Sequence, residues 1–225
     1  MEVLSSSIEA NTKLLNIYAY LYYMDVRQVW SELIFFIFLP LTLIVFQVID
    51  AGYRHLILIG VTTFLFALAW RRHWFLQPFT RIDFSTLIAW LGLTAFCAAV
   101  GILYGSTFQY AFRGWSHSVW IFIYVIPISF VQEFIFRKYL HSLLESVNAK
   151  KIVIVVIVSL AFAGMHAIYA NPVVAVSLSF VMSVLFSTLY LYHPSLLLAS
   201  LAHAILNYIG VGYCLVALTQ STCLV

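Results

Sequence analysis

The chain has 225 residues, of which 64% are hydrophobic and 8% are charged. This composition excludes an ordinary soluble globular domain and indicates an integral membrane protein. The formal net charge of +3 comes from 11 Lys and Arg against 8 Asp and Glu. No basic stripe interleaved with aromatic residues occurs in the sequence, so a nucleic-acid partner is not expected.

Residues 1–30 are expected to form a polar and interfacial N-terminal segment. The stretch "MEVLSSSIEANTK" is polar and acidic, unlike the basic and then apolar start of a cleaved signal peptide. The next stretch, "KLLNIYAYLYYM", is apolar and aromatic but too short to cross a bilayer. It is interpreted either as an interfacial helix or as an eighth, partial membrane element.

Seven apolar segments follow, and a spanning helix requires roughly 20 mainly apolar residues. The segments cover residues 33–49, 56–70, 84–104, 119–136, 152–168, 173–192 and 196–218. All should be helices, because lipid offers no partners for unpaired backbone groups. The predicted fold is therefore all-α, a polytopic membrane helix bundle of about seven transmembrane helices (six to eight), in a single membrane-embedded domain, 1–225.

The basic residues are divided unequally between the two sides that these seven spans would create. One side carries Lys13, Arg27, Arg71, Arg72, Arg81, Arg137, Lys138, Lys150 and Lys151, and the other carries Arg54 and Arg113. Cytoplasmic loops of membrane proteins carry an excess of Lys and Arg. The sequence therefore predicts a cytoplasmic N-terminus and a C-terminus on the opposite side.

Three pairs of residues four apart interrupt or accompany the later apolar segments. They are Glu133 with Arg137, Phe162 with His166, and His203 with Asn207. Residues at positions i and i+4 share one face of a helix, and ionisable groups inside membrane helices are functional-site candidates by default. If the three faces meet, they form a polar pocket inside the bundle.

The depth of these residues can be compared if the fourth helix turns near residues 148–151 into the fifth. Glu133 and His166 then lie equally far from the turn, about 22 Å at 1.5 Å per residue. His203 reaches the same depth if the turn projects roughly 10 Å beyond the hydrocarbon. The charged stretch from Arg137 to Lys151 makes such a projection reasonable.

Each residue also has a purely structural interpretation. Glu133 and Arg137 could form an intrahelical ion pair at the membrane edge. Either histidine could be a hydrogen-bonded packing residue, Asn207 could bridge two helices, and Phe162 could fill the core. The joint occurrence of the three pairs favours a shared functional site.

These residues resemble the signature of the CAAX-processing and bacteriocin-processing (CPBP, or Abi) family of intramembrane proteases. The family signature reads Glu-Glu-x-x-x-Arg, Phe-x-x-x-His and His-x-x-x-Asn on three successive membrane helices. This chain has "QEFIFR", "FAGMH" and "HAILN" in the same order, within a motif-bearing core at residues 119–208. The resemblance implies a multi-pass protein of the cytoplasmic cell membrane that hydrolyses peptide bonds in membrane-associated proteins or peptides.

The first motif departs from the family at one position. Gln132 stands where the family has its first glutamate, the residue usually given the water-activating role. Glutamine cannot act as a general base. Either Glu133 takes that role or the chemistry of the site is altered.

The catalytic set that the resemblance implies is Gln132, Glu133, Arg137, His166, His203 and Asn207. Glu133 is the candidate base and later acid, Asn207 could donate to the oxyanion, and Arg137 could orient Glu133 or dock substrate. The histidines could hold the water, or Glu133, His166 and His203 could bind a divalent metal such as zinc. The sequence leaves the presence of a metal open.

Two rival functions remain. The chain could be a catalytically silent family member that acts as a binding or immunity protein in the membrane, with Gln132 as the mark of lost chemistry. It could also be a proton-coupled carrier with Glu133, His166 and His203 as a relay. The carrier would predict internal repeats or broken helices, and the sequence has neither signal.

Overall fold

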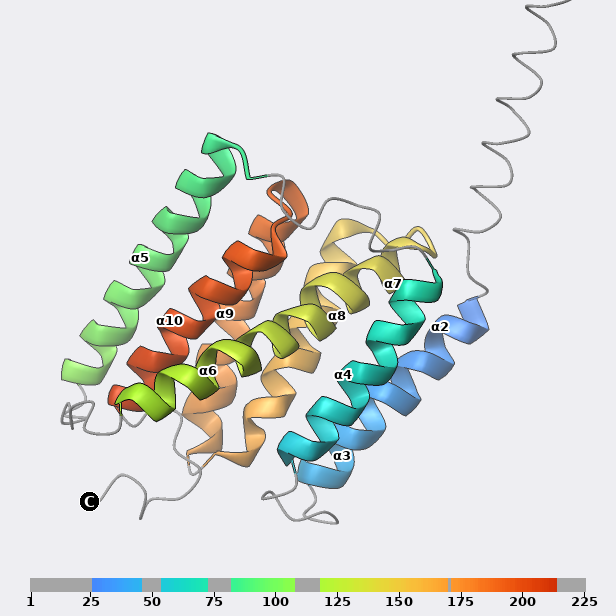
Figure 1. Cartoon of the computed structure of the whole chain (residues 1–225), viewed down its shortest axis with the longest axis horizontal. Coiled ribbons are helices and arrows are strands. Elements are labelled where there is room, and N and C mark those ends of the chain that lie inside the picture. Colours follow the sequence, from blue (N-terminus) through green and yellow to red (C-terminus); the bar gives the residue numbers. More distant parts are fainter. Residues whose placement is uncertain (1–25, 46–53, 73–81, 108–117, 170, 214–225) are drawn as a thin grey trace, which may run out of the picture.

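The computed structural model describes residues 26–45, 54–72, 82–107, 118–169 and 171–213 (Figure 1). Within these ranges the chain is helical and contains no strand, which confirms the all-α membrane bundle. The predicted interfacial stretch "KLLNIYAYLYYM" lies outside the described residues.

The described helices form seven continuous helical segments that match the seven predicted spans. Three of these segments change winding along their length. The first consists of α2 (Val26–Glu32), the π-helix η1 (Leu33–Phe38) and α3 (Leu39–Val45). The second consists of α6 (Ser118–Glu133), the π-helix η4 (Phe134–Leu140) and α7 (His141–Glu145), and the third of α8 (Lys151–Gly164) and the 3₁₀-helix η5 (Met165–Ile168). The other four are α4 (Arg54–Arg71), α5 (Phe84–Thr107), α9 (Pro172–Tyr192) and α10 (Leu196–Gly212).

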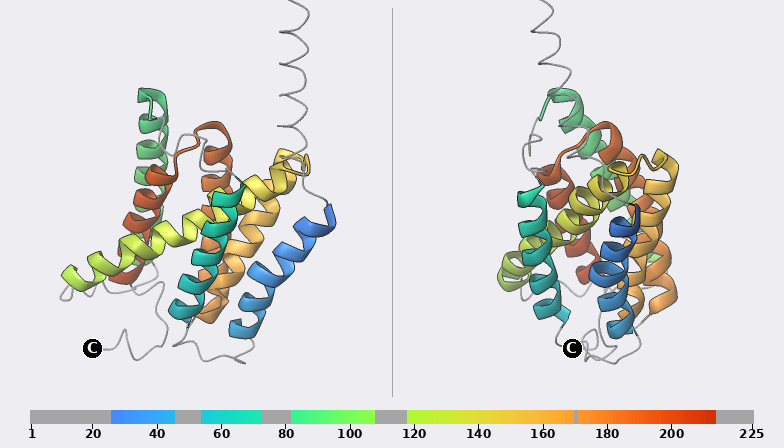
Figure 2. Two further views of the ribbon diagram at one scale, coloured as in Figure 1. Left: turned by 45° about the vertical axis from the view of Figure 1, so that its right-hand side comes forward. Right: turned by 90° about the vertical axis from the view of Figure 1, so that its right-hand side faces the viewer.

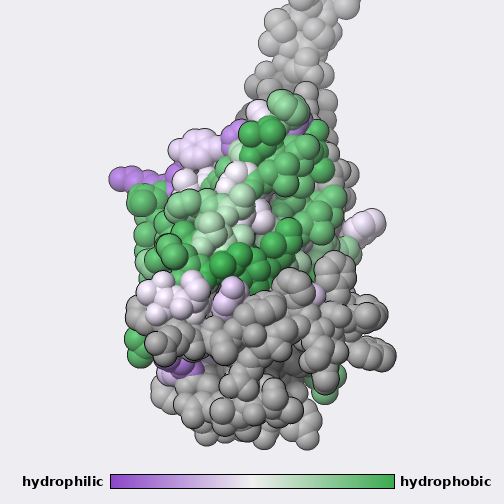
Figure 3. Space-filling model, turned by 90° about the vertical axis from the view of Figure 1, so that its left-hand side faces the viewer, coloured by the Kyte–Doolittle hydropathy of each residue, from purple (hydrophilic) through white to green (hydrophobic). Residues whose placement is uncertain are grey.

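By length and composition, three helical stretches of the described chain can cross a membrane: Phe84–Thr107, Lys151–Ile168 and Pro172–Tyr192. The side chains on the outside of α5 fit this environment, since Phe84, Ile88, Leu91, Phe96 and Leu103 are more than half exposed. Figure 3 shows the face on this side of the molecule, where hydrophobic residues cover a broad area. Such an area requires a lipid environment or a partner.

The segments alternate in direction along the chain. The start of α2, the end of α4, the start of α5, the α7–α8 turn and the α9–α10 turn all lie towards the upper end of Figures 1 and 2. Arg72, Lys150 and Lys151 belong to these ends and turns, whereas Arg54 begins α4 at the other end. These four basic residues lie at the ends where the sequence predicts them, whereas Arg137 and Lys138 are buried within η4.

Polar residues begin several helices, and an asparagine forms the α7–α8 turn. Asp83 precedes α5 and accepts from the Thr86 N–H at 2.7 Å, and Ser195 precedes α10 and accepts from the Leu198 N–H at 3.3 Å. Such oxygens satisfy amides that lack a partner in the first turn. Asn148 has φ 55°, in the left-handed region where asparagine is tolerated, so the chain turns where "NAKK" predicts.

Two apolar cores flank the middle of the bundle. One joins α2 and η1 to α4, η4, α7 and α8, and the other joins α5 to α9 and α10 through Trp90, Phe186, Ala199 and Ala202. Trp90 and Phe186 meet edge to face with ring centroids 5.3 Å apart. The helix formed by α6 and η4 packs against α10 and α8 and thus lies between the two cores.

Candidate functional site

Two polar side chains of α6 contact two side chains of α10 at equal spacing. Asn207 Nδ2 donates to Ser129 Oγ at 3.1 Å, and His203 Nδ1 lies 2.8 Å from Glu133 Oε1. Each helix contributes residues four apart, which share a face. The later residue of α10 meets the earlier residue of α6, so the two helices pack antiparallel with their polar faces in register.

Glu133 is fully buried, with an exposed fraction of 0%. Its Oε1 faces His203, and its Oε2 lies 3.3 Å from Arg137 Nε. Neither ion-pair contact has the geometry of a hydrogen bond. Within the described structure, both carboxylate oxygens can therefore still accept hydrogen bonds. Buried polar groups need partners of this kind, because burial without them costs free energy.

Arg137 is held as tightly as the carboxylate it faces, with an exposed fraction of 1%. Its guanidinium carbon lies 5.0 Å from the centre of the Phe162 ring and 5.9 Å from that of Phe186. Aromatic faces attract cations at such distances. The pairing of Glu133 and Arg137 that the sequence predicts is therefore present, with Arg137 also packed on two rings.

The winding of the fifth segment changes beside His166. The α-helical part of α8 ends at Gly164, and His166 lies in the 3₁₀ turn that follows. The His166 Nδ1 donates to the backbone carbonyl of Phe162 at 2.9 Å. Since a carbonyl only accepts, this bond places a proton on Nδ1 and fixes the orientation of the ring.

The Phe162 ring lies at the centre of the site. Its centroid is 4.8 Å from that of the His166 ring and 5.3 Å from that of the His203 ring. With Arg137 stacked on it as well, Phe162 contacts one side chain from each of the three motifs. From the sequence alone, Phe162 was interpreted as a residue that fills the core. In the structure its ring also separates and orients the polar groups of the site.

The three motifs line one cavity of about 100 Å³. Its walls include Glu133, Arg137, Phe162, His166, His203 and Asn207. The remaining walls are mostly apolar or small side chains of α5, α9 and α10. The structure thus brings together both members of every predicted pair, and the cavity is large enough for water.

Gln132 is placed differently from the other candidate residues. It is 8% exposed and does not line this cavity, and among the described residues its Oε1 has no hydrogen-bond partner. Gln132 and Glu133 are adjacent in a helix and point about 100° apart. Only one of them can face His203, and the residue that does so is Glu133.

Glu133, His166 and His203, the predicted metal ligands, share the cavity. Across the described residues, no group of three or more His, Cys, Asp or Glu side chains is placed to hold a metal ion. The assignment of the three residues as metal ligands stays a prediction.

Ser129 belongs to the site but is absent from the sequence prediction. It is fully buried and lies one helical turn before Glu133, where its hydroxyl accepts from Asn207. Its spacing of four from Glu133 continues the series that ends at Arg137. This repetition was the available signal, but serine is common in membrane helices and carries little information alone.

Comparison with known families gives an independent result. Residues 113–209 match the family model described as type II CAAX prenyl endopeptidase Rce1-like. The matched range includes every predicted site residue, from Gln132 to Asn207. No curated protein and no solved structure matches the chain.

Proposed function

Since the chain belongs to the CAAX-processing and bacteriocin-processing family of intramembrane proteases, we propose that it hydrolyses a peptide bond in a membrane-associated protein or peptide, with Glu133 activating the water. The observation that carries the proposal is the 2.8 Å contact between Glu133 and His203, within a cavity that His166 and Asn207 also line. Acid–base catalysis requires such a group within reach of the reacting atoms.

In the proposed reaction, a water in the cavity gives a proton to the Glu133 carboxylate while the water oxygen attacks the scissile carbonyl carbon. The negative charge that develops on the carbonyl oxygen is stabilised by the Asn207 amide, which Ser129 already holds in place. The C–N bond then breaks, and protonated Glu133 returns the proton to the leaving nitrogen. The products are a new carboxyl group and a new amine.

The cationic and ring groups around Glu133 prepare it for this cycle. Arg137 and His203 each contact one oxygen of the Glu133 carboxylate and so fix its direction in the cavity. His166 lines the same cavity, where the bond from its Nδ1 to the Phe162 carbonyl orients the ring beside the attacking water. Gln132, which does not line the cavity, has no part in the proton transfers.

A substrate peptide requires more room than the present cavity of about 100 Å³ offers. Ligand sites usually have about 300–1,000 Å³. The conformation described here therefore accommodates water, and binding of the peptide must separate the helices or their side chains. The walls that α5 and α9 contribute to the cavity consist mostly of apolar or small side chains.

The same site could serve a catalytically silent protein that binds peptides. The observation that favours this alternative is Gln132 at the position of the family's first glutamate. A silent protein would keep partner binding when Glu133 becomes glutamine. A protease would lose cleavage in that variant.

The test compares purified wild type with Glu133→Gln, His166→Ala and Gln132→Glu in detergent, using a quenched library of membrane-anchored peptides. We expect cleavage by wild type, loss of at least 100-fold in Glu133→Gln, and activity in Gln132→Glu no lower than in wild type. Cleavage by Gln132→Glu alone would instead identify a silenced protease. Metal analysis of wild type and His166→Ala tests the predicted metal set directly.

The proposed topology places the end that carries Arg72, Lys150 and Lys151 in the cytoplasm. Single cysteines in the α7–α8 turn, such as Asn148→Cys, should then react with a membrane-impermeant thiol reagent in inside-out vesicles only. The variant is made in a background without the native cysteines. Reaction in intact cells would reverse the assignment.

A further inference from the structure

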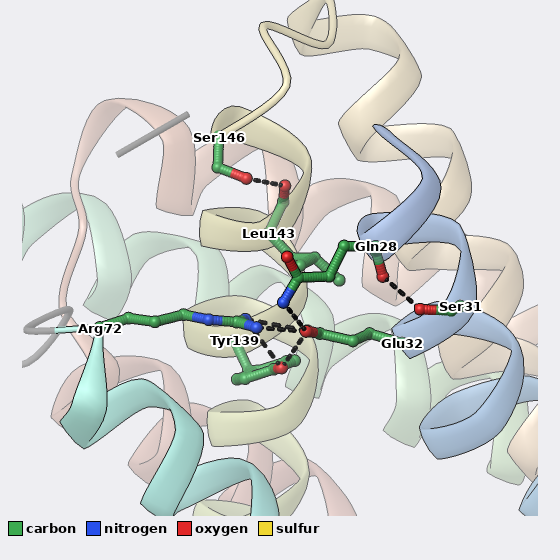
Figure 4. A network of polar contacts seen from close by, with 7 residues as sticks. All are labelled: Gln28, Ser31, Glu32, Arg72, Tyr139, Leu143 and Ser146. Carbon is green, nitrogen blue, oxygen red and sulfur yellow. Dashed lines mark hydrogen bonds and ion pairs between the residues drawn. The ribbon is translucent and has the colours of Figure 1, made fainter. Parts of the chain in front are cut away.

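A second buried polar cluster lies on the opposite side of the helix that carries Glu133. It consists of Glu32 at the end of α2, Arg72 directly after α4, and Tyr139 in the π-helix η4 (Figure 4). Glu32 is 7% exposed and Tyr139 is 0% exposed. These residues come from three separate helical segments and meet at one carboxylate.

Every oxygen of that carboxylate is hydrogen-bonded. Arg72 binds both oxygens in a fork, with Nη1 2.8 Å from Oε2 and Nη2 on Oε1. The Tyr139 hydroxyl donates to Oε2 at 2.6 Å and accepts from Arg72 Nη1 at 3.2 Å, and Gln28 approaches Oε1 at 3.4 Å. Bidentate, charge-assisted bonds of this kind are both strong and directional.

The position of Tyr139 in the chain gives the cluster its importance. Tyr139 and Arg137 lie in the same π-helical stretch. This stretch begins immediately after Glu133. A π-helix is a rare winding that is frequent at functional sites. If this stretch relaxed to an α-helix, Tyr139 would rotate relative to Glu133, and both could no longer reach their present partners.

The two faces of the π-helix are therefore held from opposite sides. On one side, Arg137 of the π-helix stacks on Phe162 of α8, and Glu133, directly before the π-helix, contacts His203 of α10. The other face binds α2 and the end of α4 through the Tyr139 hydroxyl. Buried ion pairs often contribute little net stability and can instead select one arrangement.

We infer that Tyr139, fixed by Glu32 and Arg72, is a positioning residue that keeps the π-helix wound so that Glu133 and Arg137 face His203 and Phe162. This inference rests on the proposed function for its kinetic consequence only. Its structural consequence, the placement of Glu133 beside His203, can be measured in a protein that does not cleave.

The principal variant is Tyr139→Phe, which removes one hydroxyl and keeps the ring in the core. Tyr192→Phe makes the same chemical change at the exposed end of α9, outside both the cluster and the cavity, and is the control. Glu32→Gln, which keeps the shape of the side chain but not its charge, should act like Tyr139→Phe. Two readouts are needed: steady-state kinetics, and the imidazole chemical shifts of His203, assigned with His203→Gln.

We expect Tyr139→Phe to lower kcat about tenfold, the order that a hydrogen bond to a charged group supplies, with KM within about twofold. The His203 signals should move in Tyr139→Phe and in Glu32→Gln and stay in place in Tyr192→Phe. The inference would be overturned if Tyr139→Phe left both the His203 signals and kcat unchanged. It would also be overturned if Tyr139→Phe raised KM alone.

The two proposals can fail separately. If wild type does not cleave, but Tyr139→Phe shifts the His203 signals and Tyr192→Phe does not, the positioning role stands and the proposed hydrolysis does not. If wild type cleaves and Tyr139→Phe equals it in both readouts, hydrolysis stands and the positioning role does not.

Discussion

His203 Nδ1 lies 2.8 Å from Oε1 of Glu133, and this contact joins the last motif of the chain to the first. One helical turn away, Asn207 repeats the connection to Ser129. Two contacts at equal spacing define the register of α6 against α10. A change at either contact should therefore be felt at the other.

The buried pair of Glu133 and Arg137 should be strongly coupled in stability. Arg137→Met leaves a fully buried carboxylate without its guanidinium neighbour, and we expect a loss of about 3–5 kcal/mol in the free energy of unfolding. The double variant Glu133→Gln/Arg137→Met should recover most of that loss. Denaturant unfolding in detergent measures the cycle, and additive effects of the two substitutions would show that the pair is not coupled.

Ser129 should matter through Asn207. Ser129→Ala removes the acceptor that holds the Asn207 amide, so we expect cleavage to slow by roughly fivefold, the equivalent of about 1 kcal/mol for one hydrogen bond. Ser183→Ala is the matched control, because Ser183 is buried and lines the same cavity without contacting Asn207 in the described structure. Equal effects of the two substitutions on kcat would argue against the orienting role of Ser129.

Gly105 on α5 allows close approach to Tyr213 at the end of α10. A Cβ at this position would lie 2.6 Å from Cδ1 and 3.2 Å from Cβ of Tyr213, whereas a Cβ at Gly101 would meet Ile209 at 3.7 Å. Gly105→Ala should therefore lower the free energy of unfolding by about 1–3 kcal/mol through overpacking. Gly101→Ala should be tolerated, and thermal unfolding of both variants checks the order.

Acid should weaken the start of α5 through Asp83. The backbone N–H of Thr86, with the hydroxyls of Thr86 and Ser85, lowers the pKa of Asp83 to about 2, from an ordinary value of 3.8. Because the folded pKa is the lower one, the contribution of the carboxylate is present above about pH 4 and is lost as the pH falls towards 2. Asp83→Asn cannot titrate.

The measurement for Asp83 is the thermal unfolding temperature of wild type and Asp83→Asn between pH 6 and pH 2. Wild type should be the more stable protein at pH 6, and the difference should shrink below pH 4. A difference that stays constant across this range would show that the Asp83 carboxylate does not stabilise the folded state through its charge.

The number and type of the elements could be predicted from the sequence, because lipid imposes a long apolar run and an internally bonded backbone on every span. The spacing of four within each motif was also sufficient to place Glu133 with Arg137 and His203 with Asn207 on common faces. These are local properties of a helix, and they do not depend on which helices become neighbours.

Three features depended on the tertiary structure. Which of Gln132 and Glu133 faces His203 depends on the direction of each side chain relative to α10, and here it is Glu133. The π-helical winding of η4 and the cluster of Glu32, Arg72 and Tyr139 have no local signature, since they arise from packing between segments distant in the chain. The sequence by itself determined an all-α membrane bundle with three polar helix faces. Only the packing of α2, α4, α8 and α10 around one helix decided which side chains meet, because contact depends on the rotation and register of whole helices.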